Sequence, residues 1–307
     1  MGLTVDAHID VPWQLYKQGG YDLSKRQDNH ERKVDFLRMS QGGLNAAFFA
    51  LYLSDITQDR HAPTRVHEII DEQIACLKAQ KGCRVVDNSA DAETTHADGL
   101  VPLFLGLEGG RLINADLTRL ANLRKQGVRY LTLTHNYNTG WADSATDIKY
   151  HGGLTSVGLT ILNKCDELDI LIDVSHASDD TFYDVLTNRI GPPAIATHSG
   201  CRALVNHPRN LTDKQIKQIA AAGGIVCVPF ASRFVGNRLE GVTQHIDHIC
   251  QLVGDTKHVG IGSDLDGAVM VDGVKDVSNW TYVVQSTRWS DEQMDDIKGG
   301  NLLRIFA

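Results

Sequence analysis

Short apolar runs alternate with longer helical patterns along almost the whole chain, and this alternation limits the possible folds more than any other feature of the sequence. Segment 43–53, for instance, is almost continuously apolar, which is typical of a strand covered on both faces. Segment 63–81 then repeats apolar residues at helical spacing and stops at Gly82. The eight strand-like runs begin near residue 5 and then occupy 43–53, 100–107, 128–134, 170–174, 194–197, 224–229 and 258–262.

Helical patterns separate most of these runs, near residues 63–81, 116–127, 154–168, 178–188, 212–222 and 242–253. Eight strands that alternate with helices over about 250 residues are typical of a parallel (β/α)8 barrel. A doubly wound open sheet is the competing architecture, but no Gly-x-Gly-x-x-Gly fingerprint follows a strand to support its nucleotide-binding form. Because no linker or repeat divides the chain, we predict a single α/β domain over residues 1–307, a TIM-like (β/α)8 barrel with a minor ninth strand at 83–86.

The charge and composition of the chain exclude several classes of protein. It has 42% hydrophobic and 22% charged residues and a net charge of −8, with no basic cluster, so we do not expect it to bind nucleic acid. No apolar run approaches the length of a membrane-spanning helix and no secretion signal is visible, so we expect a cytoplasmic protein without a membrane partner. The six scattered cysteines are expected to be free thiols. We also expect a homodimer.

His8 and Asp10 stand two residues apart at the end of the first apolar run. Residues with this spacing on a strand point to the same face, so the imidazole and the carboxylate are expected to project side by side. Histidine combined with aspartate or glutamate is a common ligand set for catalytic zinc. Such a pair alone more often consists of ordinary polar residues on the protein surface, so a metal site needs further ligands elsewhere in the chain.

Five other strand-like runs end in a side chain that can bind a metal ion or carry a proton, namely Glu108, His135, His176, His198 and Asp264. Each has a purely structural interpretation, such as helix capping or an Asx turn. In a barrel, however, all of them would lie at the carboxyl ends of the strands, where barrel enzymes build their active sites. We therefore predict that these side chains converge with the His8/Asp10 pair at one rim.

With these residues the chain resembles the membrane (renal) dipeptidase family, the zinc-dependent peptidase family M19, and looks like one of its soluble microbial members within the amidohydrolase superfamily. The resemblance covers essentially the whole chain, and several ordered motifs are far more specific than any one of them. The motifs are residues 6–13, Glu108-Gly109-Gly110, residues 131–136 with Trp141-Ala142-Asp143-Ser144, Asp173-Val174-Ser175-His176, His207-Pro208-Arg209-Asn210, residues 262–267 and residues 299–306.

The resemblance implies a binuclear centre with two zinc ions per chain. Glu108 would bridge the two ions, and His8 and Asp10 would complete one site. The other site would contain His176 and His198. Two Zn²⁺ ions contribute four positive charges against three negative ones from Asp10, Glu108 and a bridging hydroxide, which leaves a net positive centre. Such a centre polarises a carbonyl group and favours attack by a metal-bound hydroxide.

The remaining matched residues have implied roles toward the substrate. Asp264 would accept a proton from the attacking water and pass it to the leaving amine. His135 would hydrogen-bond the carbonyl oxygen as it gains negative charge. Arg209 offers a planar fork that suits a free carboxylate, so it would hold the C-terminus of a dipeptide. The implied catalytic residues are thus Glu108, His135 and Asp264, and the implied substrate contacts are His135, Arg209 and Asp264.

Two other functions are compatible with the same residues. A related amidohydrolase could act on N-acyl amino acids, cyclic amides or lactams, and it would need Arg209 only if the substrate carries a carboxylate. A non-catalytic, metal-stabilised or ligand-binding barrel would have no need of a proton carrier such as Asp264. Among dipeptides the L,L and L,D forms both stay open, because relatives include enzymes that accept a C-terminal D-residue. Tyr137, where secreted relatives often have cysteine, fits a reduced intracellular protein.

Overall fold

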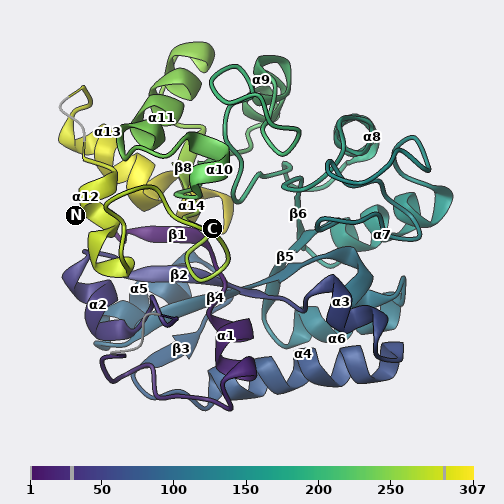
Figure 1. Cartoon of the computed structure of the whole chain (residues 1–307), viewed down its shortest axis with the longest axis horizontal. Coiled ribbons are helices and arrows are strands. Elements are labelled where there is room, and N and C mark those ends of the chain that lie inside the picture. Colours follow the sequence, from purple (N-terminus) through teal and green to yellow (C-terminus); the bar gives the residue numbers. More distant parts are fainter. Residues whose placement is uncertain (1, 28–30, 286–287) are drawn as a thin grey trace.

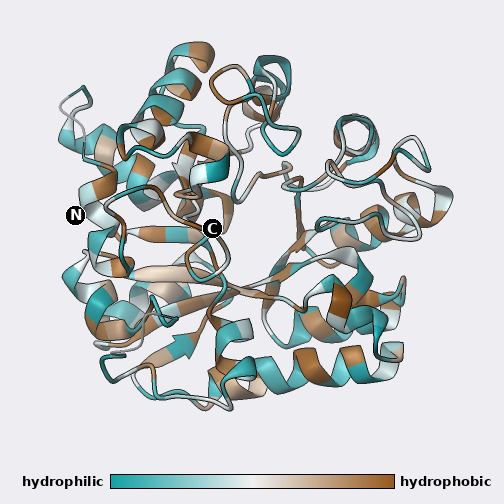
Figure 2. Ribbon diagram, in the orientation of Figure 1, coloured by the Kyte–Doolittle hydropathy of each residue, from teal (hydrophilic) through white to brown (hydrophobic). Residues whose placement is uncertain are grey.

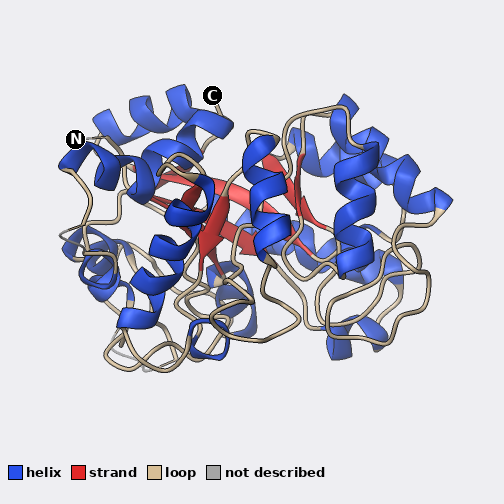
Figure 3. Ribbon diagram, turned by 90° about the horizontal axis from the view of Figure 1, so that it is seen from above, coloured by secondary structure: helices blue, strands red, loops and turns tan. Residues whose placement is uncertain are grey.

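The computed structural model describes residues 2–27, 31–285 and 288–307. Its strands run parallel and curl around a common centre (Figure 1), and the helices lie outside them (Figure 3). This arrangement confirms the predicted α/β barrel class. The strands are β1 Val5–Ile9, β2 Ala46–Leu51, β3 Cys83–Val85, β4 Val101–Glu108, β5 Val128–Thr132, β6 Leu171–Asp173, β7 Val226–Val228 and β8 Val259–Ile261.

The strand pairing forms a nearly complete circuit. One sheet has the order β1-β2-β4-β5-β6, with β3 paired to β4 at the side as the predicted minor strand, and β7 and β8 form a second pair. Isolated parallel bridges connect Asp173 to Ile195 and Ala196 to Val226, and so join the two sheets. A further bridge from Ile9 to Leu265 returns the circuit to β1. Residues from the two ends of the chain therefore meet at one rim.

The predicted strand at 194–197 is the one strand prediction that the structure corrects. Ile195 and Ala196 each make a single bridge and form no continuous strand. The physical reason is that the next two backbone amides bond to side chains, because Thr197 N donates to the Asp173 carboxylate at 2.9 Å and His198 N donates to the Ser175 hydroxyl at 3.1 Å. The backbone ladder consequently ends where the polar residues of the rim begin.

Helices cover the outside of the barrel close to the predicted positions. Side-chain caps fix where several begin, since Thr155, Ser178 and Thr212 each accept a hydrogen bond from a backbone N–H in the first turn. The six predicted helices are α4 Pro63–Lys78, α6 Leu117–Lys125, α7 Ser156–Glu167, α8 Asp179–Asn188, α9 Asp213–Ala221 and α11 Glu240–Val253.

Additional short helices lie in segments for which no helix was predicted. The α-helices are α1 Val11–Lys17, α2 Phe36–Gln41, α3 Asp55–Asp59, α5 Ser89–Ala97, α10 Ser232–Val235, α12 Trp280–Val283, α13 Asp291–Asp295 and α14 Asn301–Ile305. The turns of other pitch are η1 Gly110–Ile113, η2 Val277–Asn279 and η3 Asp296–Gly300. Most have seven residues or fewer, too short for their apolar periodicity to be recognised in the sequence.

Alternate residues of the apolar strands (Figure 2) divide between two hydrophobic clusters. In β2, Ala47 and Phe49 belong to the large cluster that includes the helices, whereas Ala46 and Phe48 belong to a smaller one. The smaller cluster collects side chains from strands around the whole circuit, so it fills the barrel interior. Phe306 completes it and packs against Phe48 in a tilted arrangement, with the ring centroids 4.5 Å apart. The six cysteines are all free, as predicted, and four of them are buried.

Candidate metal centre

The predicted site residues lie together at the carboxyl ends of the strands. Glu108 is the last residue of β4, and Asp10 follows β1 by one residue, so that it caps α1 instead of extending the strand as predicted. The backbone joins the first and last strands here, because Asp264 N donates to His8 O at 3.0 Å and Asp10 N donates to Leu265 O at 2.9 Å. This pairing brings residues from opposite ends of the sequence to the same point.

Two of the site residues have a left-handed backbone. His176 has a φ of 67° and Asp264 a φ of 62°, a region that residues other than glycine adopt rarely and at a cost of about 1–3 kcal/mol. Both follow their strands by three residues, in the loops after β6 and β8. Backbone strain of this kind clusters at functional sites, because it aims a side chain that a relaxed turn would direct elsewhere.

The Glu108 carboxylate is the centre of the cluster. Its Oε1 atom lies 3.1 Å from His176 Nε2, 3.4 Å from His198 Nε2 and 3.5 Å from His8 Nε2. His176 Nε2 and His198 Nε2 are themselves 3.0 Å apart. Ligands at the usual distance from a tetrahedral zinc ion stand roughly 3.3 Å from one another. The spacing of these four buried side chains therefore fits shared metal ligation.

Hydrogen bonds behind the cluster orient two of the imidazole rings. His8 Nδ1 is 2.9 Å from the Tyr130 hydroxyl, and His198 Nδ1 is 2.8 Å from Thr197 Oγ1. Each contact uses the far ring nitrogen and leaves Nε2 directed at Glu108, as the outer partners of metal-binding histidines do. Tyr130 has room because Gly106 lies opposite, where a Cβ atom would stand 2.0 Å from the phenol ring.

Asp10 and Asp264 extend the cluster on the side of His8. One ligand atom of each of these three residues lies within 4.8 Å of the others. Gly267 packs directly against both carboxylates, and a Cβ atom at this position would lie 2.1 Å from Asp10 Oδ2 and 2.5 Å from Asp264 Oδ1. The turn at 264–267 therefore requires a glycine to approach the two acids.

The electrostatic potential of the site is strongly negative. Burial alone would lower the pKa of His8, but the charges of Glu108, Asp10 and Asp264 raise it to about 10. Burial, partly opposed by the charge of His8, raises the pKa of Asp264 to about 6. Buried carboxylates gathered in this way are usually paired with cations or coordinate metals. The potential fits a site built for divalent cations.

Together the donor set favours zinc or a similar ion. Imidazole nitrogens and carboxylate oxygens are suitable ligands for zinc, and the described residues contain no cysteine in the cluster. His8 Nε2 is buried and has no hydrogen-bond partner among the described residues, as expected of an atom kept for a metal ion. The candidate groups of ligands are His8/Glu108/His198, Glu108/His135/His176 and His8/Asp10/Asp264.

A pocket of about 390 Å³ opens above the cluster. His135 and Asp264 line it, as predicted for substrate contacts, together with Tyr52, which the sequence did not single out. Its lining consists of Asp10, Tyr52, Glu108, His135, Asn136, His176, Ala231, Arg233, Phe234, Asp264, Gly267, Ala268 and Val269.

Arg209 lies beside this pocket but is not one of its lining residues. The guanidinium is 4% exposed, donates from Nη2 to His198 O at 3.4 Å, and stands 5.2 Å from the centre of the Phe234 ring. Its Nε and Nη1 atoms have no hydrogen-bond partner among the described residues. The Arg209 guanidinium is thus held close to the cluster and next to Phe234, which does line the pocket. Two of its nitrogen atoms keep N–H donors that no described residue accepts.

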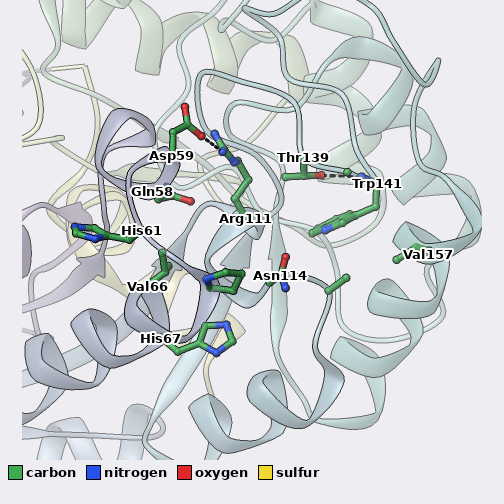
Figure 4. A pocket seen from close by; sticks show the side chains of 13 residues that line it. Gln58, Asp59, His61, Val66, His67, Arg111, Asn114, Thr139, Trp141 and Val157 are labelled. Carbon is green, nitrogen blue, oxygen red and sulfur yellow. Dashed lines mark hydrogen bonds and ion pairs between the residues drawn. The ribbon is translucent and has the colours of Figure 1, made fainter.

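A second pocket, of about 530 Å³, lies on the other side of the turn that follows Glu108 (Figure 4). Arg111 and Asp59 form an ion pair at its wall, near Trp141 and Thr139. None of the predicted site residues lines this pocket, and no candidate group of metal ligands among the described residues lies in it. Asp10, Glu108, His135, His176 and Asp264 instead line the pocket above the cluster.

A parallel β/α barrel with a buried cluster of histidines and carboxylates at its strand ends belongs to the class of amidohydrolase-type, metal-dependent barrels. Within that class, the chain belongs to the membrane dipeptidase family (peptidase family M19), which it matches over residues 2–307. Dipeptidase 3 of Macaca fascicularis and Dipeptidase 3 of Homo sapiens are each 31% identical to it over 98% of this chain. The chain spans 64% of the length of these relatives.

Solved structures of similar proteins have the same fold. A metallopeptidase from Rhodobacter sphaeroides, liganded with a phosphinate mimic of the dipeptide L-Ala-D-Ala, has a TM-score of 0.88 and 26% identity, covering 99% of this chain and 98% of that one. The dipeptidase AC, a metallopeptidase of family M19, has a TM-score of 0.87 and 26% identity with the same coverage. Among the described residues, no helix is both long and apolar enough to span a membrane.

Proposed function

We propose that the chain is a dipeptidase that uses two zinc ions. The observation that carries this proposal is the position of Glu108, whose Oε1 atom lies 3.5 Å from His8 Nε2, 3.1 Å from His176 Nε2 and 3.4 Å from His198 Nε2. A carboxylate with ligands on two sides suits a bridge between two cations. Zinc ions held by this donor set would act as Lewis acids and increase the acidity of water.

The residues around the cluster supply the remaining chemistry. Asp264 stands beside Asp10 and faces the pocket, where it would take a proton from the attacking water and deliver it to the leaving amine. His135, which lines the same pocket, would donate a hydrogen bond to the carbonyl oxygen as negative charge develops there.

Arg209 would bind the C-terminal carboxylate of the substrate. Its Nε and Nη1 atoms have no hydrogen-bond partner among the described residues, so the guanidinium keeps N–H donors for a carboxylate. Phe234 lines the pocket and its ring centre lies 5.2 Å from the guanidinium, whereas Arg209 is not a lining residue, so we propose that the Phe234 side chain shifts when a substrate binds. The phosphinate mimic of L-Ala-D-Ala bound to the Rhodobacter relative makes L,D-dipeptides candidate substrates beside the L,L forms.

A substrate panel tests the proposed activity. Zinc-loaded protein would be assayed against L,L- and L,D-dipeptides, their C-terminal amides, N-acyl amino acids and lactams. We expect hydrolysis of free dipeptides and the release of two amino acids. Turnover confined to N-acyl amino acids or lactams would instead favour the alternative, another amidohydrolase on the same centre. No turnover of any compound by fully metal-loaded protein would contradict both.

Metal analysis tests the binuclear centre separately. We expect about two zinc equivalents per chain by elemental analysis of active protein prepared without chelator, and fewer in a Glu108→Gln variant, because the shared carboxylate is lost. Full activity at one equivalent would contradict the bridging arrangement while leaving a single-metal peptidase in place.

A further inference from the structure

His135 has a buried partner that the proposed chemistry does not use. Its Nδ1 atom lies 2.9 Å from Asp55 Oδ2, and Asp55 is only 5% exposed. Asp55 is the first residue of α3, the short helix that follows β2, and does not line the pocket above the metal cluster. A buried acid that touches a pocket residue without facing the pocket acts on the reaction only through that residue.

The contact fixes the direction of the His135 ring. An ionised carboxylate can only accept hydrogen bonds, so Nδ1 must be the donor toward Asp55. Nε2 is then the nitrogen left for the pocket, and it can donate to a carbonyl oxygen only when it carries a proton as well, so the proposed role requires a ring protonated on both nitrogens. The ring centroid lies 4.7 Å from that of Tyr52 and 4.5 Å from that of His176. Without Asp55 the ring could rotate or lose one of the two protons, and the donor aimed at the carbonyl oxygen would be lost.

Asp55 is itself held in place by Arg111. The Arg111 guanidinium reaches Asp55 Oδ1 at 3.4 Å and also pairs with Asp59, one helical turn further along α3. Figure 4 shows Arg111 and Asp59 joined at the wall of the neighbouring pocket. Arg111 follows Glu108 by only three residues, in the turn η1. The turn that directly follows Glu108 therefore also fixes Asp55, the partner of His135.

We propose that Asp55 is the positioning residue for His135, and that Arg111 keeps the Asp55 carboxylate in the required orientation. The proposal rests on the proposed function only for the role of His135 toward the substrate. The arrangement resembles the acid–imidazole pairs of other hydrolases, in which a buried carboxylate fixes the tautomer and direction of a histidine that touches the substrate.

Kinetics of a double-mutant cycle test the proposal. Asp55→Ala should lower kcat about 10–100-fold with little change in KM, because the lost interaction forms only as the oxyanion develops. Asp55→Glu should recover part of the loss. The double variant Asp55→Ala/His135→Ala should be no slower than His135→Ala alone, because Asp55 acts through the ring. Losses that multiply in the double variant would overturn the proposal and assign Asp55 a separate structural role.

Matched controls separate positioning from general destabilisation. Asp59→Asn removes the other acid bound by Arg111, on the same helix but without contact to His135, and should keep kcat within about 3-fold of wild type. Arg111→Met should lower kcat less than Asp55→Ala does, while the metal content of both variants stays at the wild-type value. Equal kcat losses in Asp59→Asn and Asp55→Ala would contradict a specific role for Asp55.

A spectroscopic readout keeps this proposal independent of the enzyme assay. In ¹H–¹⁵N spectra of the histidine side chains, assigned with a His135→Gln variant, wild-type His135 should carry a proton on Nδ1 as well as on Nε2. The Asp55→Ala variant should lose the Nδ1 signal. If wild-type protein hydrolyses no dipeptide but shows the Nδ1 proton, the proposed function fails and the positioning contact stands. A wild-type ring protonated only on Nε2 would overturn the positioning proposal even if the enzyme is active.

Discussion

At the scale of single residues, Gly267 has no room for a side chain. A methyl group there would lie 2.1 Å from Asp10 Oδ2 and 2.5 Å from Asp264 Oδ1, inside the van der Waals distance of both. We expect Gly267→Ala to displace these carboxylates and to cost about 1–3 kcal/mol through overpacking. Zinc content and thermal midpoint would measure the effect. Gly140→Ala is the control, since nothing lies within 4 Å of a Cβ there; equal losses in both variants would contradict the prediction.

A second prediction at this scale concerns Asp264. Replacing Asp264 with asparagine keeps the size of the side chain but removes its ability to carry a proton. We expect Asp264→Asn to retain the fold and the metal while turnover falls about 10²–10⁴-fold, the usual contribution of general acid–base catalysis. Elemental analysis and circular dichroism would verify the first part and steady-state kinetics the second. Wild-type turnover in a metal-loaded variant would remove Asp264 from the mechanism.

The sequence indicates the residues of the cluster better than their supports. His8, Glu108 and Asp264 could be found because each follows an apolar run, and strand ends meet at one rim in any parallel barrel. Tyr130 could not, because it lies in the middle of a strand and its contact with His8 joins residues that only the folded barrel brings together. Asp55 was not identified either, because it belongs to a helix that is too short to be recognised in the sequence.

At the scale of elements, the long connection between β5 and α7 depends on one carboxylate. Asp143 accepts hydrogen bonds from the backbone N–H groups of Tyr150, His151, Gly152 and Gly153, and it is 1% exposed. Burial alone would raise its pKa, but these donors lower it below the ordinary value. The connection has little regular structure, so this acid holds it beside the site.

We expect Asp143→Ala to lower the free energy of unfolding by about 1.5–3 kcal/mol at pH 7, the contribution of hydrogen bonds to a buried charge. A carboxylate with a lowered pKa stabilises the fold above its unfolded pKa and loses that effect as the pH falls through the folded value. Urea titrations should therefore show a constant difference from wild type down to about pH 4 and a smaller one below.

The Asp180→Ala variant serves as the control for Asp143, because Asp180 forms only an exposed ion pair with Lys149. Its unfolding free energy should stay within about 0.5 kcal/mol of wild type. If the Asp143→Ala difference were the same at every pH, lost packing would explain it better than the charge of the carboxylate.

The strand prediction at 194–197 shows what apolar patterns leave out. The segment does pair on both sides, since Ile195 N donates to Ile172 O and Ala196 N donates to Ile225 O, each at 2.9 Å. Its hydrophobic residues therefore gave the correct place in the barrel. The ladder ends because the Asp173 carboxylate and the Ser175 hydroxyl, on the neighbouring segment, accept hydrogen bonds from the next two backbone amides. Hydrophobic periodicity carries no information about such side-chain acceptors.

At the scale of the whole molecule, we expect metal binding to be coupled to folding. The cluster joins residues from β1, β4 and the loops after β6 and β8, so a metal ion bound there ties distant parts of the chain together. A ligand that binds only the folded state at 100 times its Kd stabilises that state by about 2.7 kcal/mol. We therefore expect chelator to lower the thermal midpoint by roughly 5 °C or more, and added zinc to restore it.

Scanning calorimetry of the Glu108→Gln variant provides the comparison for this effect. Without the shared carboxylate the variant should respond to chelator much less than wild type does. An identical response in the two proteins would place the stabilising metal ion somewhere other than the Glu108 cluster. The barrel class itself needs no such test, because the strand pairings and bridges already show the circuit.

Phe306 has a consequence for how the molecule assembles. Its ring completes the barrel interior against Phe48 and Phe104, side chains that are synthesised far earlier. During translation, the apolar side chains on one face of the first strands are therefore not fully covered until Phe306 has been synthesised. Contacts between such distant parts of a chain form slowly. The nascent barrel is thus exposed to aggregation until this contact forms.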